Sequence, residues 1–482
     1  MTSADNTGAT CALCGDPATL RCSNCRQQFY CKKDHQKEDW MRHRIFCRVW
    51  EIRETPELGR HLIATRDLAP GEIVITENPL TWGPALHTGE RVCVGCGKSN
   101  ATARCVRCAW PACSQKCEGL LDDDRHGAEC ALLEKARIIP RCDVLLVLRV
   151  LLLRRRSPKK WALLSSLQSH EEARGPGTEA HQEMQEVARA LGPLFTLDPS
   201  SREILPKVCG LIDVNALETN PPQGCAALYE VACLLEHRCI SNTRHGFSID
   251  FKGRPCISVT AVTSIKKGEH LSTTYTHALW ATRARRDHLM ATKYFACRCE
   301  RCADPTELQT HLGTLVCPCG PGLVLPKDPL DSETEWSCTS CPGVLTSAEV
   351  ADLTCRLGDE VETAMSNANE DTLSSLLSRL KVLLHPGHQH CIAVSHSLIQ
   401  LLSPNDPQKP DTCKRIVETT TRIDPYGSRL ALYTAIALRE LASCPGEDKK
   451  ALLSRAVSLL TPEPKDSPGG KLLKLISGEI SK

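Results

Sequence analysis

The chain has 482 residues, a formal net charge of +2 and 30 cysteines. This length exceeds one ordinary hydrophobic core and predicts several domains. The small net charge excludes a general electrostatic attraction to nucleic acid or to anionic membranes. The first residues show no secretory pattern, so we expect a soluble intracellular protein, in which abundant cysteines favour metal binding over disulfides.

Two stretches of the N-terminal third are rich in cysteine and histidine. Each holds eight candidate ligands in four closely spaced pairs, and eight ligands make two tetrahedral zinc sites. A secreted disulfide scaffold is the alternative explanation of these cysteines. The first set is Cys11, Cys14, Cys22, Cys25, Cys31, His35, His43 and Cys47, and the second is Cys93, Cys96, Cys105, Cys108, Cys113, Cys117, His126 and Cys130.

The rest of the chain alternates between strand and helix patterns. Residues 59–80 predict two short strands around a Pro-Gly turn. Residues 131–235 favour helices, including a buried helix at 144–153 that is too short to span a bilayer. Residues 247–276 alternate as three strands, and 345–482 favour helices with one buried stripe. Together these patterns predict an α+β multidomain fold.

The later cysteines form further candidate sites. Cys317, Cys319, Cys338 and Cys341 have a spacing like that of a zinc ribbon and would close one site. Cys239, by contrast, stands alone in the stretch LLEHRCISNTRH at 234–245, without a second cysteine at metal spacing. An ordinary buried thiol is the alternative explanation of this cysteine.

Two segments carry a resemblance to a known family. YCKKDHQKEDWMRHRIFC at 30–47 resembles a MYND zinc finger, and GRHLIATRDLAPGEIVITENPL at 59–80 resembles the opening strands of a SET domain. Nearly the whole chain is similar to SMYD-type SET and MYND domain proteins, most of all to the arthropod SmydA branch, with an additional N-terminal MYND finger.

The resemblance implies a domain order. The β-rich SET domain is split by an inserted MYND finger and a helical insert, and is followed by a post-SET zinc site and a helical TPR-like C-terminal domain. The implied segments are the N-terminal MYND finger (1–50), the first SET part (51–92), the second MYND finger (93–130), the helical insert (131–210), the SET core (211–280), the post-SET segment (281–304), the ribbon-like segment (305–345) and the C-terminal domain (346–482).

The resemblance also implies how the zinc ligands are grouped. In a MYND finger the first and third ligand pairs share one zinc ion, and the second and fourth share another. In the family, the counterpart of Cys239 joins three cysteines that match Cys297, Cys299 and Cys302 here. With the ribbon-like site, about six zinc ions are expected.

SET domains transfer a methyl group from S-adenosylmethionine to a lysine amine. The resemblance therefore implies a protein-lysine N-methyltransferase acting on histone or non-histone lysines. Tyr275 matches the family's catalytic tyrosine, with a packed strand tyrosine as the alternative. Asn242 closes the motif that contains Cys239, and a structural role suits it at least as well as ligand binding. The implied cofactor-binding residues are Gly59, Arg60, Asn215, Glu236, His237 and Phe295.

Four positions depart from the family pattern. His61 stands in place of a second glycine and Glu236 in place of an asparagine. Arg238 replaces a serine, and Lys293 replaces a tyrosine. A carboxylate accepts hydrogen bonds but does not donate them, although it can pair with the ammonium group of the cofactor. These departures leave a second function open, that of a catalytically weak or inactive adaptor and transcriptional regulator.

The expected partners are proteins. A substrate with a target lysine is one, and proline-containing peptides are typical ligands of MYND fingers, with a purely structural finger as the alternative. Membrane association is not expected, nor is direct nucleic-acid binding, because the basic stretch at 148–160 predicts a solvated helix end. His385, His388 and His390 fit the family's helix-start pattern better than a metal site. We expect a monomer in the nucleus, the cytoplasm or both.

Overall fold

The computed structural model describes residues 9–480 except 24, 26–27, 45–46, 85–90, 124, 138–140, 251 and 466. The chain forms two compact units. The first comprises Met1–Glu236 and Thr243–Leu271, and the second comprises His237–Asn242 and Ser272–Lys482. The short strand β11 (Glu236–His237) lies where the chain crosses from the first unit to the second.

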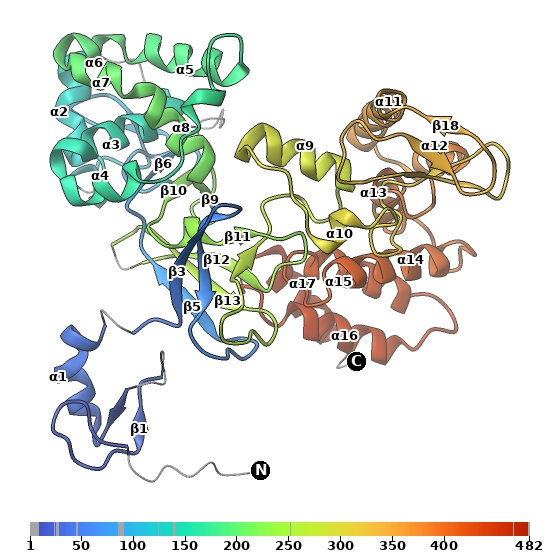
Figure 1. Cartoon of the computed structure of the whole chain (residues 1–482), viewed down its shortest axis with the longest axis horizontal. Coiled ribbons are helices and arrows are strands. Elements are labelled where there is room, and N and C mark those ends of the chain that lie inside the picture. The colour runs from blue at the N-terminus through green and yellow to red at the C-terminus, as the bar shows by residue number, and fades with distance from the viewer. Residues whose placement is uncertain are drawn as a thin grey trace. The chain divides into compact units, whose positions relative to one another are not determined.

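The sheets of the first unit join strands that are distant in sequence (Figure 1). β3 and β4 form a hairpin, while β5 is the edge of the sheet β12-β13-β5 and β6 is the edge of the sheet β6-β10-β9. The segment between β6 and β9, with its finger and helices, is therefore an insertion into the strand-rich part. These strands are β3 (Trp50–Thr55), β4 (Gly59–Ala64), β5 (Ile73–Glu77), β6 (Thr81–Pro84), β9 (Leu217–Thr219), β10 (Cys225–Leu228), β12 (Thr243–Ile249) and β13 (Pro255–Ala261).

The inserted helices mostly match the predicted helical region. They are α2 (Gly127–Ala136), α3 (Cys142–Arg156), α4 (Pro158–Ser165), α5 (Glu179–Ala190), α6 (Gly192–Leu197), α7 (Pro199–Glu203) and α8 (Leu205–Asn215), with 3-10 turns η2 (Glu171–Ala173) and η3 (Ala232–Leu234). The prediction of helix up to residue 235 is wrong for β9 and β10. β10 is fully buried and pairs with β6, and the periodicity of such a short apolar run does not distinguish strand from helix.

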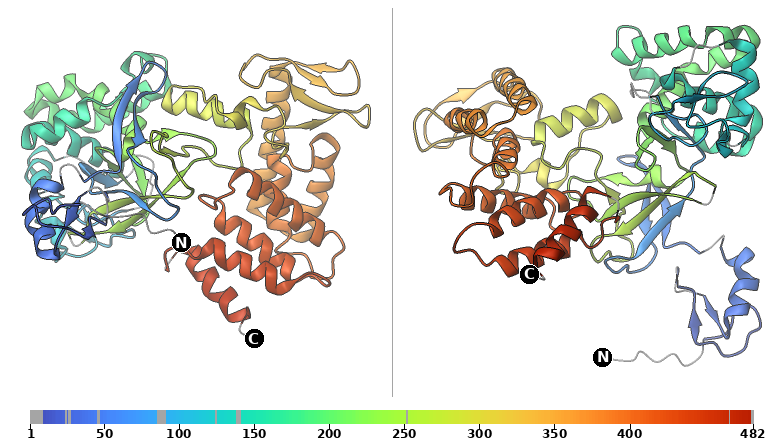
Figure 2. Two further views of the ribbon diagram at one scale, coloured as in Figure 1. Left: turned by 60° about the horizontal axis from the view of Figure 1, so that its bottom comes forward. Right: turned by 180° about the vertical axis from the view of Figure 1, so that it is seen from behind.

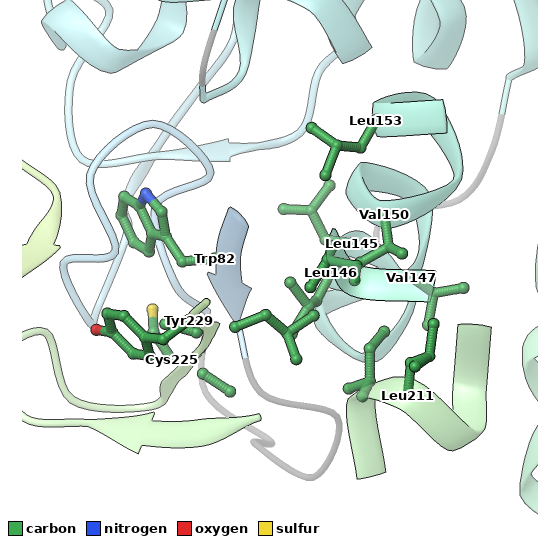
Figure 3. Packing of buried hydrophobic residues seen from close by; sticks show 14 of the residues in the cluster. Trp82, Leu145, Leu146, Val147, Val150, Leu153, Leu211, Cys225 and Tyr229 are labelled. Carbon is green, nitrogen blue, oxygen red and sulfur yellow. The ribbon is translucent and has the colours of Figure 1, made fainter. Parts of the chain in front are cut away.

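Helix α3 lies at the centre of the largest hydrophobic core, as its apolar run predicted. Residues 144–148 are all fully buried. Figure 3 shows side chains of α3 between Trp82 and Tyr229 on one side and Leu211 on the other. Arg149 is also buried, so the prediction of a solvated helix end does not hold for this residue. No helix in the described part of the chain has the length and apolar character needed to cross a membrane.

The fingers in the first unit contain only short elements. The first has β1 (Leu20–Arg21), β2 (Phe29–Tyr30) and α1 (Lys33–His43). The second has β7 (Ala103–Arg104), β8 (Pro111–Ala112) and the 3-10 turn η1 (Glu118–Leu120), and α2 begins at its end. In both fingers the strands pair as an antiparallel hairpin.

The second unit is mainly helical, as predicted (Figure 2). Its short strands are β14 (Ser272–Thr273) and the antiparallel meander β15 (Leu315–Val316), β16 (Leu323–Pro326), β17 (Trp336–Cys338) and β18 (Val344–Leu345). Its helices are α9 (Thr282–Lys293), α10 (Glu300–Ala303), α11 (Ser347–Ser366), α12 (Glu370–Leu383), α13 (Gln389–Leu398), α14 (Lys409–Ile423), α15 (Ala431–Ala442), α16 (Lys449–Leu460) and α17 (Pro468–Ile480). The side chain of His388 caps α13 by accepting from the His390 backbone at 3.2 Å, which agrees with a helix-start role.

Candidate active site and zinc centres

The first finger brings its candidate ligands together in two groups of four. Within each group the ligand atoms all lie within 4.8 Å of one another. The Sγ atoms of Cys22 and Cys47 are 3.5 Å apart and those of Cys14 and Cys31 3.6 Å. A zinc tetrahedron with bonds of about 2.3 Å has an edge of about 3.8 Å, so these donor sets fit zinc. The groups are Cys11, Cys14, Cys31 and His35, and Cys22, Cys25, His43 and Cys47.

The second finger repeats this interleaved arrangement. Its groups are Cys93, Cys96, Cys113 and Cys117, and Cys105, Cys108, His126 and Cys130. His126 Nδ1 donates to Glu129 Oε1 at 2.9 Å, while its Nε2 lies 3.3 Å from Cys108 Sγ. A carboxylate on one ring nitrogen fixes the tautomer and leaves the other nitrogen to a metal. In both fingers the first pair groups with the third and the second with the fourth, as the resemblance implied.

A third kind of centre lies in the second unit, where Cys239 meets Cys297, Cys299 and Cys302 within 4.8 Å. Arg285, which is fully buried, places Nε 3.2 Å from Cys239 Sγ and Nη2 3.3 Å from Cys302 Sγ. Four thiolates around a zinc ion carry a net negative charge, and the adjacent guanidinium offsets it. The lone cysteine of the sequence therefore has three partners from the segment after α9.

The ribbon-like cysteines also approach one another. The Sγ atoms of Cys317 and Cys341 are 3.7 Å apart, as are those of Cys319 and Cys338. They belong to the meander β15–β18 and the turns between its strands. Every cysteine whose side chain the structure describes is free of disulfides, which argues against the disulfide scaffold.

Gly59 and Glu236, two of the predicted cofactor residues in the first unit, lie on neighbouring chain segments. Gly59 opens β4 with φ +63°, a left-handed conformation that glycine adopts without strain. Leu62 of β4 accepts a hydrogen bond from Leu271 N at 2.9 Å, and Leu271 accepts one from Glu236 N at 3.3 Å. Residue 271 therefore joins β4 to Glu236.

The other two, Arg60 and Asn215, hold one short loop of the same unit. The Arg60 guanidinium donates to the Ser166 carbonyl at 2.7 Å. The Asn215 amide donates to the Gln168 carbonyl at 2.8 Å and to Leu211 at the preceding turn of α8. Both side chains therefore shape the loop at 166–168 through hydrogen bonds.

His61 and His270 form a feature that the sequence reasoning missed. The His61 ring is 1% exposed, so it lies inside the unit, and its Nδ1 donates to the Gly59 carbonyl at 3.0 Å. It stacks on His270 with ring centroids 4.6 Å apart, and His270 Nδ1 donates to Glu236 Oε2 at 2.8 Å. No motif marked His270, and its strand bridge to Ile63 and the hydrogen bonds of its neighbours Glu269 and Leu271 bring it beside β4.

The remaining predicted residues gather in the second unit. The rings of Tyr275, His237 and Phe295 lie 5.3–6.4 Å apart, centroid to centroid. His237 Nδ1 accepts from Tyr275 N at 2.9 Å, and its Nε2 lies 3.4 Å from Cys239 Sγ. Burial lowers the pKa of His237 to about 4, which suits a neutral ring with an accepting Nδ1. Both ring nitrogens of His237 are therefore engaged within the second unit.

Asn242 has a structural role in the second unit. Its Oδ1 accepts from the backbone N–H of Ser272 at 2.9 Å, and its side chain is buried. Lys293, one of the departures from the family pattern, ends α9, and Tyr294 follows it in a left-handed conformation with φ +61°. Arg238 is half-buried, and its backbone N–H donates to the Thr273 carbonyl at 3.1 Å.

Comparisons with known proteins agree with this arrangement. The MYND finger family matches residues 11–47, and the SET domain family matches residues 59–276. The SET domain-containing protein SmydA-8, isoform B, of Drosophila melanogaster is 33% identical over 329 residues, covering 63% of this chain and 68% of that protein. Histone-lysine N-methyltransferase SMYD3 of Homo sapiens is 28% identical over 268 residues, covering 52% and 60%.

Among solved structures, the SET domain of LSMT bound to lysine and AdoHcy aligns with 92% of this chain and 90% of that chain. Its identity of 12% and TM-score of 0.33 are too low to support an argument. The case rests on the two family matches, the interleaved ligand groups and the extent of the likeness to SmydA-8. The chain belongs to the SMYD family of SET and MYND domain proteins.

Proposed function

We propose that this protein transfers a methyl group from S-adenosylmethionine to lysine side chains of protein substrates, histone or non-histone. The SET match over residues 59–276 and the SMYD3 relative, named as a histone-lysine N-methyltransferase, support this function. The observation that carries the proposal is the packing of Tyr275 with His237 and Phe295 beside the cluster of Cys239. The family's catalytic tyrosine is therefore held by a rigid, metal-binding neighbourhood.

The chemistry requires no strong general base, but it requires accurate positioning of the lysine amine. S-adenosylmethionine, when bound, supplies an electrophilic methyl group on a sulfonium. A lysine that has given up its proton to water would accept this methyl group on Nζ, and S-adenosylhomocysteine would be released. We assign Tyr275 the task of orienting the neutral amine through its hydroxyl, and Phe295 that of excluding water. The His237 ring accepts a hydrogen bond from the Tyr275 backbone N–H, so it fixes the backbone position from which the Tyr275 side chain projects.

The test is transfer of labelled methyl groups by the full-length, zinc-loaded protein to histones and to a panel of lysine-containing proteins. We expect acid-stable label on lysine, and about a 100-fold loss in Tyr275→Phe, since misplacement of a reacting group typically costs about this much. A wild-type protein that binds the cofactor but labels no substrate beyond the level of Tyr275→Phe would exclude the enzymatic function.

We propose a second role, protein recruitment, for the first finger. Its helix α1 exposes Trp40 (42%) and Met41 (65%), large apolar side chains that soluble surfaces seldom expose side by side. An exposed aromatic ring suits the proline-containing peptides typical of MYND fingers, because proline packs on aromatic faces. If methyl transfer is absent, this recruitment is the function that remains, and the chain is an adaptor.

The C-terminal helices add a further expected interaction module. α14, α15, α16 and α17 pack in sequence around one apolar core. We propose that they form a TPR-like array, because successive antiparallel helices that each bury one stripe are typical of such repeats.

A further inference from the structure

We propose that His270 is a positioning residue that fixes the Glu236 carboxylate as the receptor for the ammonium group of the cofactor's amino-acid part. This inference rests on the proposed function and adds a specificity determinant to it. The family has an asparagine in place of Glu236, so the ionic contact is a property of this chain's own residues.

The first observation concerns the Glu236 carboxylate. Its side chain is only 12% exposed, yet within the described residues neither a lysine nor an arginine forms an ion pair with it. Its protein partner is His270, whose Nδ1 lies 2.8 Å from Oε2. A carboxylate is acceptor-only, so the ring nitrogen must be the donor, and Oε1 remains able to accept from a ligand. A mostly buried carboxylate without a fixed cation favours a cationic ligand.

The second observation concerns what holds His270. Its ring stacks on His61 at 4.6 Å with an interplanar angle of 22°. The His61 ring is buried and donates to the carbonyl of Gly59, at the start of β4. A chain of contacts therefore runs from Gly59 through His61 and His270 to Glu236, and each member lies in the first unit. It orients the carboxylate relative to the glycine that the family uses for the cofactor.

This arrangement also explains the replacement of the second glycine by histidine. The His61 ring turns inward and supports His270, so the departures at 61 and 236 form one structural unit. Asparagine at 236 has its own donor and acceptor, whereas glutamate needs an external donor to fix its rotamer. We therefore infer that His61, His270 and Glu236 function as a set.

Two variants of His270 distinguish the contribution of its hydrogen-bond donor from the contribution of its ring. His270→Phe keeps a ring for His61 to stack on but removes the donor. His270→Asn removes the ring but keeps a donor at the Nδ1 position. Glu236→Gln removes the charge at nearly constant shape. For each full-length variant, calorimetry measures the affinity for S-adenosylhomocysteine, which carries the ammonium group, and for methylthioadenosine, which lacks the amino-acid part.

We expect Glu236→Gln to weaken S-adenosylhomocysteine binding about 10- to 100-fold and His270→Phe about 3- to 10-fold, while His270→Asn stays within about twofold of wild type. Methylthioadenosine affinity should not change in any variant. Zinc content and circular dichroism confirm that each variant is folded.

Equal losses for both ligands would overturn the inference, because Glu236 would then act on the adenosine part or on the fold. A loss in His270→Asn as large as in His270→Phe would also overturn it, since the ring rather than the donor would matter. If wild type binds S-adenosylhomocysteine and no variant changes its affinity, the inference fails and the proposed function stands. If wild type binds neither ligand, both fail.

Discussion

The two fingers have the same spacing within their ligand pairs but pack against different parts of the molecule. In the first, buried residues such as Tyr30 and Cys22 form a small hydrophobic cluster of the finger's own residues. In the second, Cys93, Trp110 and Leu120 belong to the same core as helix α3. Both share the interleaved ligand groups, so the metal geometry does not decide their roles. The second finger is therefore part of the main hydrophobic core, whereas the first has its own small cluster and is the one for which we propose partner binding.

The candidate metal-binding histidines of the two fingers also differ in the hydrogen-bond partners of their second ring nitrogen. His126 Nδ1 binds Glu129, which also forms an ion pair with the buried Arg149 at 2.9 Å. Arg149 in turn donates to the Val94 carbonyl inside the finger. In the first finger, by contrast, His43 Nδ1 is buried and has no hydrogen-bond partner among the residues that the structure describes. Burial lowers the pKa of His43, which keeps the ring neutral for a metal but does not orient it.

The largest expected effect comes from breaking the buried network of the second finger. Glu129→Gln leaves the Arg149 guanidinium in the interior without its carboxylate, which costs about 3–5 kcal/mol of unfolding free energy. The matched control is Glu134→Gln on the same helix, which removes an exposed pair with Arg107 and should cost less than about 1 kcal/mol. Urea unfolding of both variants measures the difference. If both variants lost a similar, small amount of unfolding free energy, the second finger would not be integrated into the core.

An intermediate effect is expected on zinc release. Because an outer carboxylate partner typically contributes about 10- to 100-fold to metal affinity, the site of His43 should lose zinc to a chelator before the site of His126. Native mass spectrometry of the intact protein counts the ions, and alkylation identifies the freed cysteines, such as Cys25 or Cys108. Release from both sites together, or in the reverse order, would contradict the comparison.

The smallest effect on stability is expected at the exposed apolar residues, where the fingers should differ in binding. Trp40→Ala should change unfolding free energy by less than about 0.5 kcal/mol and abolish binding of proline-containing peptides. Leu121→Ala in the second finger, at a side chain that is 86% exposed, is the control and should leave binding unchanged. Fluorescence anisotropy with labelled synthetic peptides measures both. Loss of binding in Leu121→Ala alone would reverse the assignment of roles.

Local patterns made much of this architecture predictable. Zinc ligands are recognisable because a metal requires several donors at short, fixed spacing, so the eight ligands of each finger could be anticipated from their spacing. Their division into two groups of four required the family resemblance. The strands β4 and β5 were likewise evident from alternation around a turn. The link from Cys239 to Cys297 required the family resemblance, because the two are 58 residues apart.

Long-range polar contacts explain what sequence reasoning missed. Arg149 lies in an apolar run that predicts a buried helix, but its partner Glu129 is 20 residues away, and periodicity does not encode that pairing. His270 and Glu236 are 34 residues apart and meet only because β4 and residue 271 pair. Such contacts follow from the packing of helices α2 and α3 and from strand pairing in three dimensions, so only the structure could identify them.

The central claim, that this fold serves methyl transfer, requires the cofactor to bind. The most direct measurement is equilibrium dialysis of the zinc-loaded, full-length protein against labelled S-adenosylmethionine. We expect saturable binding of one equivalent per chain, displaced by unlabelled S-adenosylhomocysteine. Absence of saturable binding to protein with its full zinc content would contradict it and leave the first finger as the functional part.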